Sequence, residues 1–435
     1  MGAVVKNDAT VNGTLVAADW VLPVASPAIK HGAVAVHEGQ IAWVGKLEEA
    51  PAEVAGWPIE RHAGILTPGL VNGHTHLQYT GFVELGRGSY TSFEHWSEEF
   101  EVFYDAVTDP AEWGVAAREG AQLALRSGST AFAEIVTDEP ARGTLAGFGL
   151  QGIEYLEAIG ETEARWGSGG REAFTAWLDQ ASECVVGVSP HAPYSLDGEV
   201  IRELTELARA RGMRIHSHVG ESSVEASLYD FGNRDVLEIY GDMRDEFALI
   251  RGGGTGLSTA RYAESIDLLG RDSHLAHGIY LDRADRDLLR ETGTRVALCP
   301  RSNRVIGLAA APVGDYLREG HEFAVGTDSL SSSPSLDLLA DVAALAELAT
   351  AQGYADDDLH ERLLAAATLG GAAVLGRDDL GALRAGMRAD LAVFDVRVAE
   401  GEDARRALVE RGEGSCTLTV IGGTVRFTRG AIVSA

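Results

Sequence analysis

Lysine and cysteine are both scarce in this chain of 435 residues. The lysines are Lys6, Lys30 and Lys46. Because none occurs later, any mechanism that needs a lysine in the body of the chain is excluded. The cysteines are Cys184, Cys299 and Cys416. They lie far apart in apolar runs and no pair has the spacing of a metal site, so we expect buried, reduced thiols in a cytoplasmic protein.

Basic residues are also few, with 36 against 65 acidic ones and a net charge of −29. This balance argues against nucleic acid or an anionic membrane as a partner. No apolar run is long enough to span a bilayer, and the segment 1–8 lacks the apolar core of a signal peptide. We therefore expect a cytoplasmic protein that acts on a small molecule, and we leave a homodimer open as its assembly.

Short apolar runs alternate with amphipathic helical patterns through the middle of the chain. The runs are 65–72, 129–135, 149–155, 184–189, 213–219, 273–278, 295–299 and 323–326. The helical patterns between them are 111–126, 171–180, 198–211, 259–269, 283–291 and 313–319. This alternation predicts an α/β protein built on a (β/α)8 TIM barrel, in which the active site lies at the carboxyl ends of the strands.

The two ends of the chain have a different pattern, which consists of short β-type runs separated by glycine and proline. Each end alone is too short to bury a core. We therefore predict that residues 1–65 and 384–435 pair into one small, discontinuous β-sandwich domain, and that residues 66–383 form the barrel.

Two imidazoles follow the first predicted barrel strand. His74 and His76 would point the same way on a strand, because side chains repeat every second residue, and would form half of a tetrahedral metal site. A solvated turn is the alternative interpretation of this pair. Other strand ends carry further polar residues, which are His191, Tyr194, His218, Glu221, His277, Ser302, Asn303 and Asp328. Each has a structural explanation by itself, but their shared position at strand ends predicts an active site.

This ordered set resembles the amidohydrolase superfamily, and within it the cytosine/adenosine deaminase-like and chlorohydrolase-like group. The resemblance extends from the segment 68–76 (PGLVNGHTH) to the segment 386–394 (GMRADLAVF). The family pattern has His-x-His after the first strand, His with Glu three residues later after the fifth, His after the sixth and Asp after the eighth. The matching residues are His74, His76, His218, Glu221, His277 and Asp328.

The resemblance implies a metal site, whose ligands would be His74, His76, His218 and Asp328. Imidazole nitrogens with one carboxylate suit Zn²⁺, with Fe²⁺ as a substitute. Binuclear branches of the superfamily bridge two metals with a carboxylated lysine from the fourth strand, and this chain has no lysine there, so we infer one metal ion. His216 also lies in the fifth segment, and since its spacing to Glu221 does not fit the pattern, we expect it to pack elsewhere.

The resemblance also implies a hydrolytic mechanism on an aromatic amidine-like carbon. Asp328 would take the proton of the attacking water, and Glu221 would protonate the ring nitrogen. His277 would hold or polarise the oxygen, and ammonia would then leave. The sequence thus predicts a mononuclear, metal-dependent deaminase.

Candidate substrate contacts are Gln78, Tyr79, Arg87, Glu154, His191, Tyr194, Ser302 and Asn303, the last two as plausible partners of the catalytic groups. The tetrad at 77–80 (LQYT) is similar to the Leu-Glu-Phe-Ser of aminodeoxyfutalosine deaminases, and the segment 93–96 (FEHW) also resembles that group. We therefore expect a 6-aminopurine nucleoside as substrate, with aminodeoxyfutalosine, a precursor of menaquinone, as the first choice.

Several alternatives stay open at this point. One is deamination of adenosine, S-adenosylhomocysteine, methylthioadenosine or guanine, although the segment 89–92 lacks the carboxylate that adenosine-type relatives carry there. Another is a triazine chlorohydrolase or aminohydrolase of the same fold. A non-catalytic scaffold is disfavoured, because none of the six positions that carry the chemistry is eroded.

Overall fold

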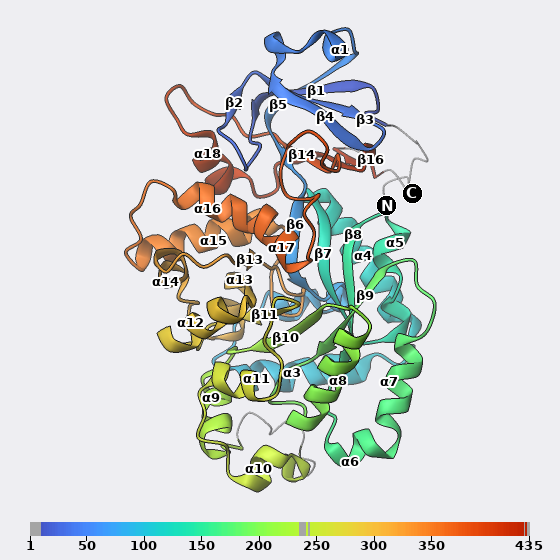
Figure 1. Cartoon of the computed structure of the whole chain (residues 1–435), viewed down its shortest axis with the longest axis vertical. Coiled ribbons are helices and arrows are strands. Elements are labelled where there is room, and N and C mark those ends of the chain that lie inside the picture. The colour runs from blue at the N-terminus through green and yellow to red at the C-terminus, as the bar shows by residue number, and fades with distance from the viewer. Residues whose placement is uncertain (1–9, 235–240, 242–243, 430, 433–435) are drawn as a thin grey trace.

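The computed structural model describes residues 10–234, 241, 244–429 and 431–432. The segment 1–8, on which the expectation about a signal peptide rests, lies outside them. Two bodies are visible in Figure 1, a small sheet domain at one end and a larger barrel of strands and helices. Both ends of the chain contribute to the small domain, as predicted. No helix among the described residues has the length and apolar character needed to cross a membrane.

The strands of the small domain form one hydrogen-bonded sheet in the order β17-β16-β15-β14-β5-β1-β3-β4, with β2 paired to β1. Their bounds are β1 Thr14–Val21, β2 Ile29–Lys30, β3 Gly32–His37, β4 Gln40–Lys46, β5 Ile59–Pro68, β14 Leu391–Phe394, β15 Cys416–Ile421, β16 Thr424–Thr428 and β17 Ala431–Ile432. One apolar core of this domain includes Val34, Leu66, Val393 and Val420. A second, smaller one is formed by N-terminal residues such as Leu15. The two ends of the chain therefore share the larger of the two cores.

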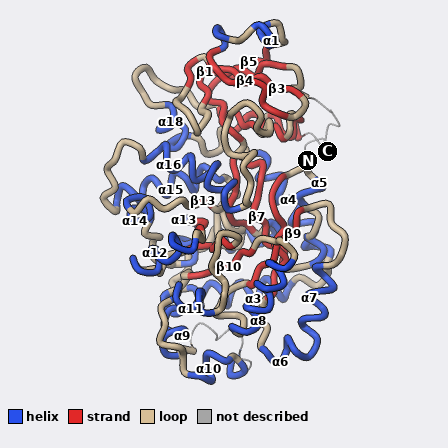
Figure 2. Tube along the Cα trace, in the orientation of Figure 1, coloured by secondary structure: helices blue, strands red, loops and turns tan. Residues whose placement is uncertain are grey.

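The second sheet is the barrel, with the order β13-β12-β11-β10-β9-β8-β7-β6 and parallel neighbours throughout. Its strands are β6 Leu70–Thr75, β7 Ser129–Val136, β8 Gln151–Ala158, β9 Val185–Pro190, β10 Ile215–Val219, β11 Ser273–His277, β12 Arg295–Leu298 and β13 Ala324–Val325. Figure 2 shows these strands inside a layer of helices. The predicted (β/α)8 barrel is thereby confirmed.

Helices connect and cover these strands. The longer ones are α3 Phe93–Ala106, α4 Ala111–Arg126, α7 Arg171–Leu178, α8 Gly198–Ala210, α9 Ser223–Phe231, α12 Arg283–Thr292, α15 Leu338–Ala351 and α18 Ala404–Arg411. The shorter ones are α1 Ala52–Ala55, α2 Val83–Gly86, α5 Thr144–Gly147, α6 Glu163–Arg165, α10 Ala248–Gly252, α11 Thr259–Ser265, α13 Pro300–Ile306, α14 Val313–Arg318, α16 Leu359–Ala365 and α17 Gly371–Val374. In α4, buried alanines at helical spacing form the face that packs inward.

The run predicted as one strand over 65–72 is divided between the two sheets. β5 ends at Pro68 and pairs with β14, whereas β6 begins at Leu70 in the barrel. Gly69 lies at the break, where an added Cβ would stand 2.1 Å from Thr130 Oγ1. The close approach of the two bodies therefore requires glycine at this position.

Candidate active site

The first and last barrel strands meet at a seam of polar contacts. Asn72 donates its side-chain NH₂ to Thr327 Oγ1 at 2.7 Å, and its side-chain oxygen accepts from the Thr327 amide at 3.1 Å. The Asp328 amide then donates to the His74 carbonyl at 3.1 Å. Because these bonds fix the register between β6 and β13, they bring the carboxylate of Asp328 next to the first histidine pair.

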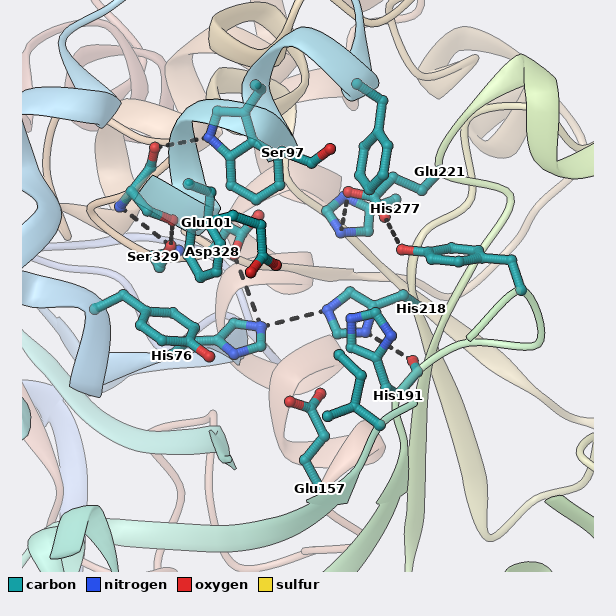
Figure 3. A pocket seen from close by; sticks show the side chains of 17 residues that line it. His76, Ser97, Glu101, Glu157, His191, His218, Glu221, His277, Asp328 and Ser329 are labelled. Carbon is teal, nitrogen blue, oxygen red and sulfur yellow. Dashed lines mark hydrogen bonds and ion pairs between the residues drawn. The ribbon is translucent and has the colours of Figure 1, made fainter. Parts of the chain in front are cut away.

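Four side chains converge at this seam, and they are the four metal ligands expected from the sequence (Figure 3 shows three of them). The Nε2 atoms of His76 and His218 are 3.3 Å apart. Asp328 Oδ1 lies 3.6 Å from His74 Nε2 and 3.9 Å from His76 Nε2. A tetrahedral metal with bonds of about 2.0–2.1 Å separates its ligand atoms by about 3.3 Å. The donor atoms therefore have nearly the spacing that one divalent metal ion requires.

The opposite ring nitrogens hold these histidines in place. His218 Nδ1 donates to the His191 carbonyl at 2.8 Å, so that its Nε2 carries a lone pair. His74 Nδ1 bonds to His216 Nε2 at 3.0 Å, and the buried Nε2 of His74 has no hydrogen-bond partner among the described residues. Burial lowers the pKa of His74, His76 and His218, which keeps these three histidines neutral, as metal ligands must be. This donor set fits a divalent metal.

The sequence did not foresee the role of His216, which was expected to pack elsewhere. Its ring stacks on that of His74, with centroids 4.8 Å apart.

Orienting partners of a metal-bound histidine usually contribute a factor of about 10–100 in metal affinity. We therefore expect His216→Phe to weaken metal binding by that factor, as measured by competition with a chromogenic chelator. His216→Gln retains an acceptor for His74 Nδ1 and should lose less; equal affinity in both variants and the wild type would contradict this role.

Glu221 lies beside the metal ligands, and its orientation is fixed on both sides. The Tyr194 hydroxyl donates to Glu221 Oε2 at 3.0 Å, and His277 Nε2 lies 3.4 Å from Oε1. The loop before it is held by Glu225, whose carboxylate accepts from the amides of Gly220 (2.9 Å) and Glu221 (2.8 Å). Burial, with the nearby charge of Asp328, raises the pKa of Glu221 to about 8. Glu221 is thus a carboxylic acid at neutral pH.

Asp328 has the opposite protonation. Burial alone would raise its pKa, but His74, His277 and His76 outweigh that effect and lower the pKa well below the ordinary value. Its Oδ2 accepts from the hydroxyls of Ser302 (2.7 Å) and Ser332 (3.0 Å). Two neighbouring carboxyl groups whose pKa values are driven apart are the usual basis of paired acid and base chemistry.

His277 is held by Asn303, whose Oδ1 lies 3.3 Å from His277 Nδ1. The backbone at His277 and Asp328 has φ values of 73° and 57°, which residues with a Cβ rarely adopt. Such strain persists only where the surrounding structure imposes it, and it is concentrated at functional sites. Ser302 and Asn303 therefore hold the side chains of Asp328 and His277 in place.

A pocket opens over these groups. Its walls are largely aromatic, and α3 supplies Phe93, Trp96 and Phe100. Tyr79 and Tyr194, both expected from the sequence, also line it, as does His191. Glu101 and Ile159 also line it, and Ile159 is 43% exposed. The pocket can thus enclose a flat ring against the metal ligands.

Besides Ser302 and Asn303, three of the predicted substrate contacts lie outside this pocket, so that five of the eight do not line it. Gln78 is buried and donates to Asp138 Oδ2 at 2.9 Å. Arg87 is exposed and pairs with Glu84 at 2.8 Å. Glu154 is buried but accepts from the amides at 143 and 145, so its carboxylate stabilises the start of α5. Each of these polar groups is satisfied by its own neighbours, which corrects the prediction for all three.

Sequence reasoning missed Glu157, which does line the pocket. The third strand was predicted over 149–155, whereas β8 continues to Ala158. Ending the strand too early selected Glu154, although Glu157 lies three residues later at the true carboxyl end. Burial raises the pKa of Glu157 to about 8. The apolar run 156–159 around it was the available signal for a longer strand.

Comparison with known proteins gives consistent relationships. The chain is 30% identical to a 5-methylthioadenosine/S-adenosylhomocysteine deaminase of Haloarcula marismortui, over 77% of this chain and 73% of the relative. It is 29% identical to a 5'-deoxyadenosine deaminase of Methanosarcina mazei, over 85% of this chain and 81% of the relative. Its fold is similar to that of Helicobacter pylori aminofutalosine deaminase, with a TM-score of 0.80 at 18% identity, covering 95% of this chain and 100% of that one.

The family model described as the amidohydrolase family matches residues 65–426. That range includes every barrel strand, from β6 to β13, and the side chains of His74, His76, His218 and Asp328. The chain therefore belongs to the amidohydrolase family of metal-dependent hydrolases.

Proposed function

We propose that the protein hydrolytically deaminates a 6-aminopurine ribonucleoside that carries a 5′ substituent, with one bound Zn²⁺. The observation that carries this proposal is the pair of Glu221 and Asp328, an acid and a base next to the converging histidines. The deaminase names of the relatives support it. Nitrogen donors with one carboxylate favour Zn²⁺ over Mg²⁺, which prefers an all-oxygen site.

When bound, the metal would lower the pKa of a coordinated water toward about 7 and so supply a nucleophile at neutral pH. Asp328 is ionised and can take the proton of that water. Glu221 is protonated and can donate to the ring nitrogen next to the attacked carbon, which makes the ring electrophilic. His277, held by Asn303, lies beside Glu221 and can stabilise the oxygen that becomes the product carbonyl. The amino group then takes the proton held by Asp328 and leaves as ammonia, and the proton of the added hydroxyl passes to Glu221.

The pocket suits a nucleoside better than a free base. The aromatic side chains of α3 can stack on a purine. Glu101, an exposed residue that lines the same pocket, can accept hydrogen bonds from sugar hydroxyls. Ile159 offers an exposed apolar contact for a 5′ substituent. Within this class, aminodeoxyfutalosine remains our first choice, because the segment 77–80 is similar to the tetrad of the enzymes that act on it.

The test is ammonia release from a panel of 6-aminopurine compounds. It should include adenine, adenosine, 5'-deoxyadenosine, methylthioadenosine, S-adenosylhomocysteine and aminodeoxyfutalosine, with an aminotriazine as the comparison from another class. We expect the highest kcat/KM for a nucleoside with a 5′ substituent. Turnover of the triazine alone, or of adenine in preference to every nucleoside, would overturn the proposal.

A further inference from the structure

Glu157 is a buried acidic side chain whose free oxygen belongs to the pocket. Its Oε2 accepts from the Thr137 hydroxyl at 2.7 Å, and Thr137 in turn accepts from the Tyr79 hydroxyl at 3.2 Å. Its Oε1 has no hydrogen-bond partner among the described residues, although the side chain is only 5% exposed. A buried carboxyl oxygen that is left unpaired is unfavourable, because it has lost its hydrogen bonds to water and gained none in return. Such an oxygen in a pocket indicates a ligand that pairs with it.

His191 stands next to this carboxyl group, and the ligand atoms of Glu157, His191 and His218 lie within 4.8 Å of one another. His191 Nδ1 bonds to Ser195 Oγ at 2.7 Å, and Ser195 gives its own proton to the Ala192 carbonyl at 3.0 Å. The proton of this pair must therefore come from His191 Nδ1. Consequently the other ring nitrogen of His191, Nε2, carries a lone pair.

These three residues do not form a second metal site. His218 Nδ1 is used in its bond to the His191 carbonyl, and its Nε2 faces His76 Nε2 at 3.3 Å. His218 thus has no nitrogen left for another ion. Glu157 and His191 remain as a pair of polar groups on the pocket wall, available to an organic ligand.

The position of this pair limits which part of a ligand can reach it. In Figure 3, Glu157 and Glu221 lie on opposite sides of the His76 and His218 rings. If a carbon atom of a planar ring reacts next to these histidines, the other atoms of that ring lie close to the same two side chains. A sugar attached to the far side of a purine lies further from these histidines than the base does. Glu157 is therefore at the level of the base.

We propose that Glu157 determines base specificity, by pairing through Oε1 with the edge of the base that faces away from Glu221. This inference rests on the proposed function, because it assumes a 6-aminopurine substrate. Glu157 would act in binding and orientation, whereas Glu221 acts on the reacting side.

The experiment compares the wild type with Glu157→Gln and Glu157→Leu on four compounds: the preferred 6-aminopurine riboside and its 3-deaza, 2-amino and 2′-deoxy analogues. We expect Glu157→Leu to lower kcat/KM for the parent riboside by about 10–100-fold, mainly through KM, with full metal content. The wild-type preference between the parent and the two base analogues should shrink toward one in this variant. The preference between the parent and the 2′-deoxy analogue should stay as in the wild type. Glu157→Gln, which keeps the shape, should give intermediate values.

Glu154→Gln is the matched control, since it alters a buried carboxylate on the same strand that lies outside the pocket. It should leave all three preferences unchanged. The inference would be overturned if Glu157→Leu kept the wild-type preference between the parent riboside and the two base analogues. It would also be overturned if only the preference between the parent and the 2′-deoxy analogue changed. If the wild type deaminates no riboside, the proposed function fails and the inference falls with it. Normal wild-type turnover with unaltered base preferences in the variants overturns the inference alone.

Discussion

Glu221→Gln is expected to lower kcat by about 10²–10⁴-fold, the usual contribution of a positioned acid or base. Glutamine keeps the shape and can still accept from the Tyr194 hydroxyl, but it cannot donate an acidic proton to the ring nitrogen. The metal content should match that of the wild type, because Glu221 is not among the four converging ligands. Steady-state kinetics with metal analysis on the same preparation measures both quantities.

The dependence of kcat on pH provides a second test of the role of Glu221. Burial raises the pKa of Glu221 to about 8, and its protonated form is the active one. The wild-type kcat should therefore fall as the pH rises through this pKa, and the residual activity of Glu221→Gln should lack that decline. Near-normal turnover in the variant, or an unchanged alkaline decline, would show that another group delivers the proton.

Removal of the metal is expected to abolish turnover and to lower the melting temperature. Without the ion, the lone pairs of His74, His76 and His218 face one another in a buried site, and no activated water is available. A ligand present at 100 times its Kd stabilises the folded state by about 2.7 kcal/mol, so the apoprotein should unfold at a lower temperature. Chelation followed by calorimetry and activity measurement tests both effects.

Reconstitution provides the control for this experiment. Zn²⁺ should restore turnover and melting temperature together, and Fe²⁺ is the other ion that suits these donors. Mg²⁺ should restore neither, because it prefers oxygen ligands in octahedral geometry. An apoprotein that retains full turnover after verified loss of metal would contradict the metal-dependent mechanism.

The fold could be predicted well from the sequence because the barrel strands are buried on both faces. β7, for example, is buried along its whole length, so it appears as a continuous apolar run. The helix predicted over 111–126 has those bounds in the structure. The division at Gly69 was not visible, since an apolar run does not reveal which of two sheets each residue joins.

The converging histidines and Asp328 were predictable for a related reason. They stand at strand ends, and the topology of a barrel brings all such ends to one face. Substrate contacts were harder to predict, because they depend on the exact end of each strand and on the neighbours of each side chain. Glu154 and Glu157 illustrate the first difficulty, and Gln78 illustrates the second, since its hydrogen bonds to Asp138 exist only in the folded protein.

The seam between β6 and β13 has a consequence for folding. Asn72 and Thr327 are 255 positions apart, so their contact forms only after the intervening chain has been ordered. The four converging side chains depend on that same closure, since His74 and His76 lie on one side of the seam and Asp328 on the other. Incompletely folded chains therefore lack the complete ligand set, and tight metal binding marks the molecules in which the last strand has docked on the first.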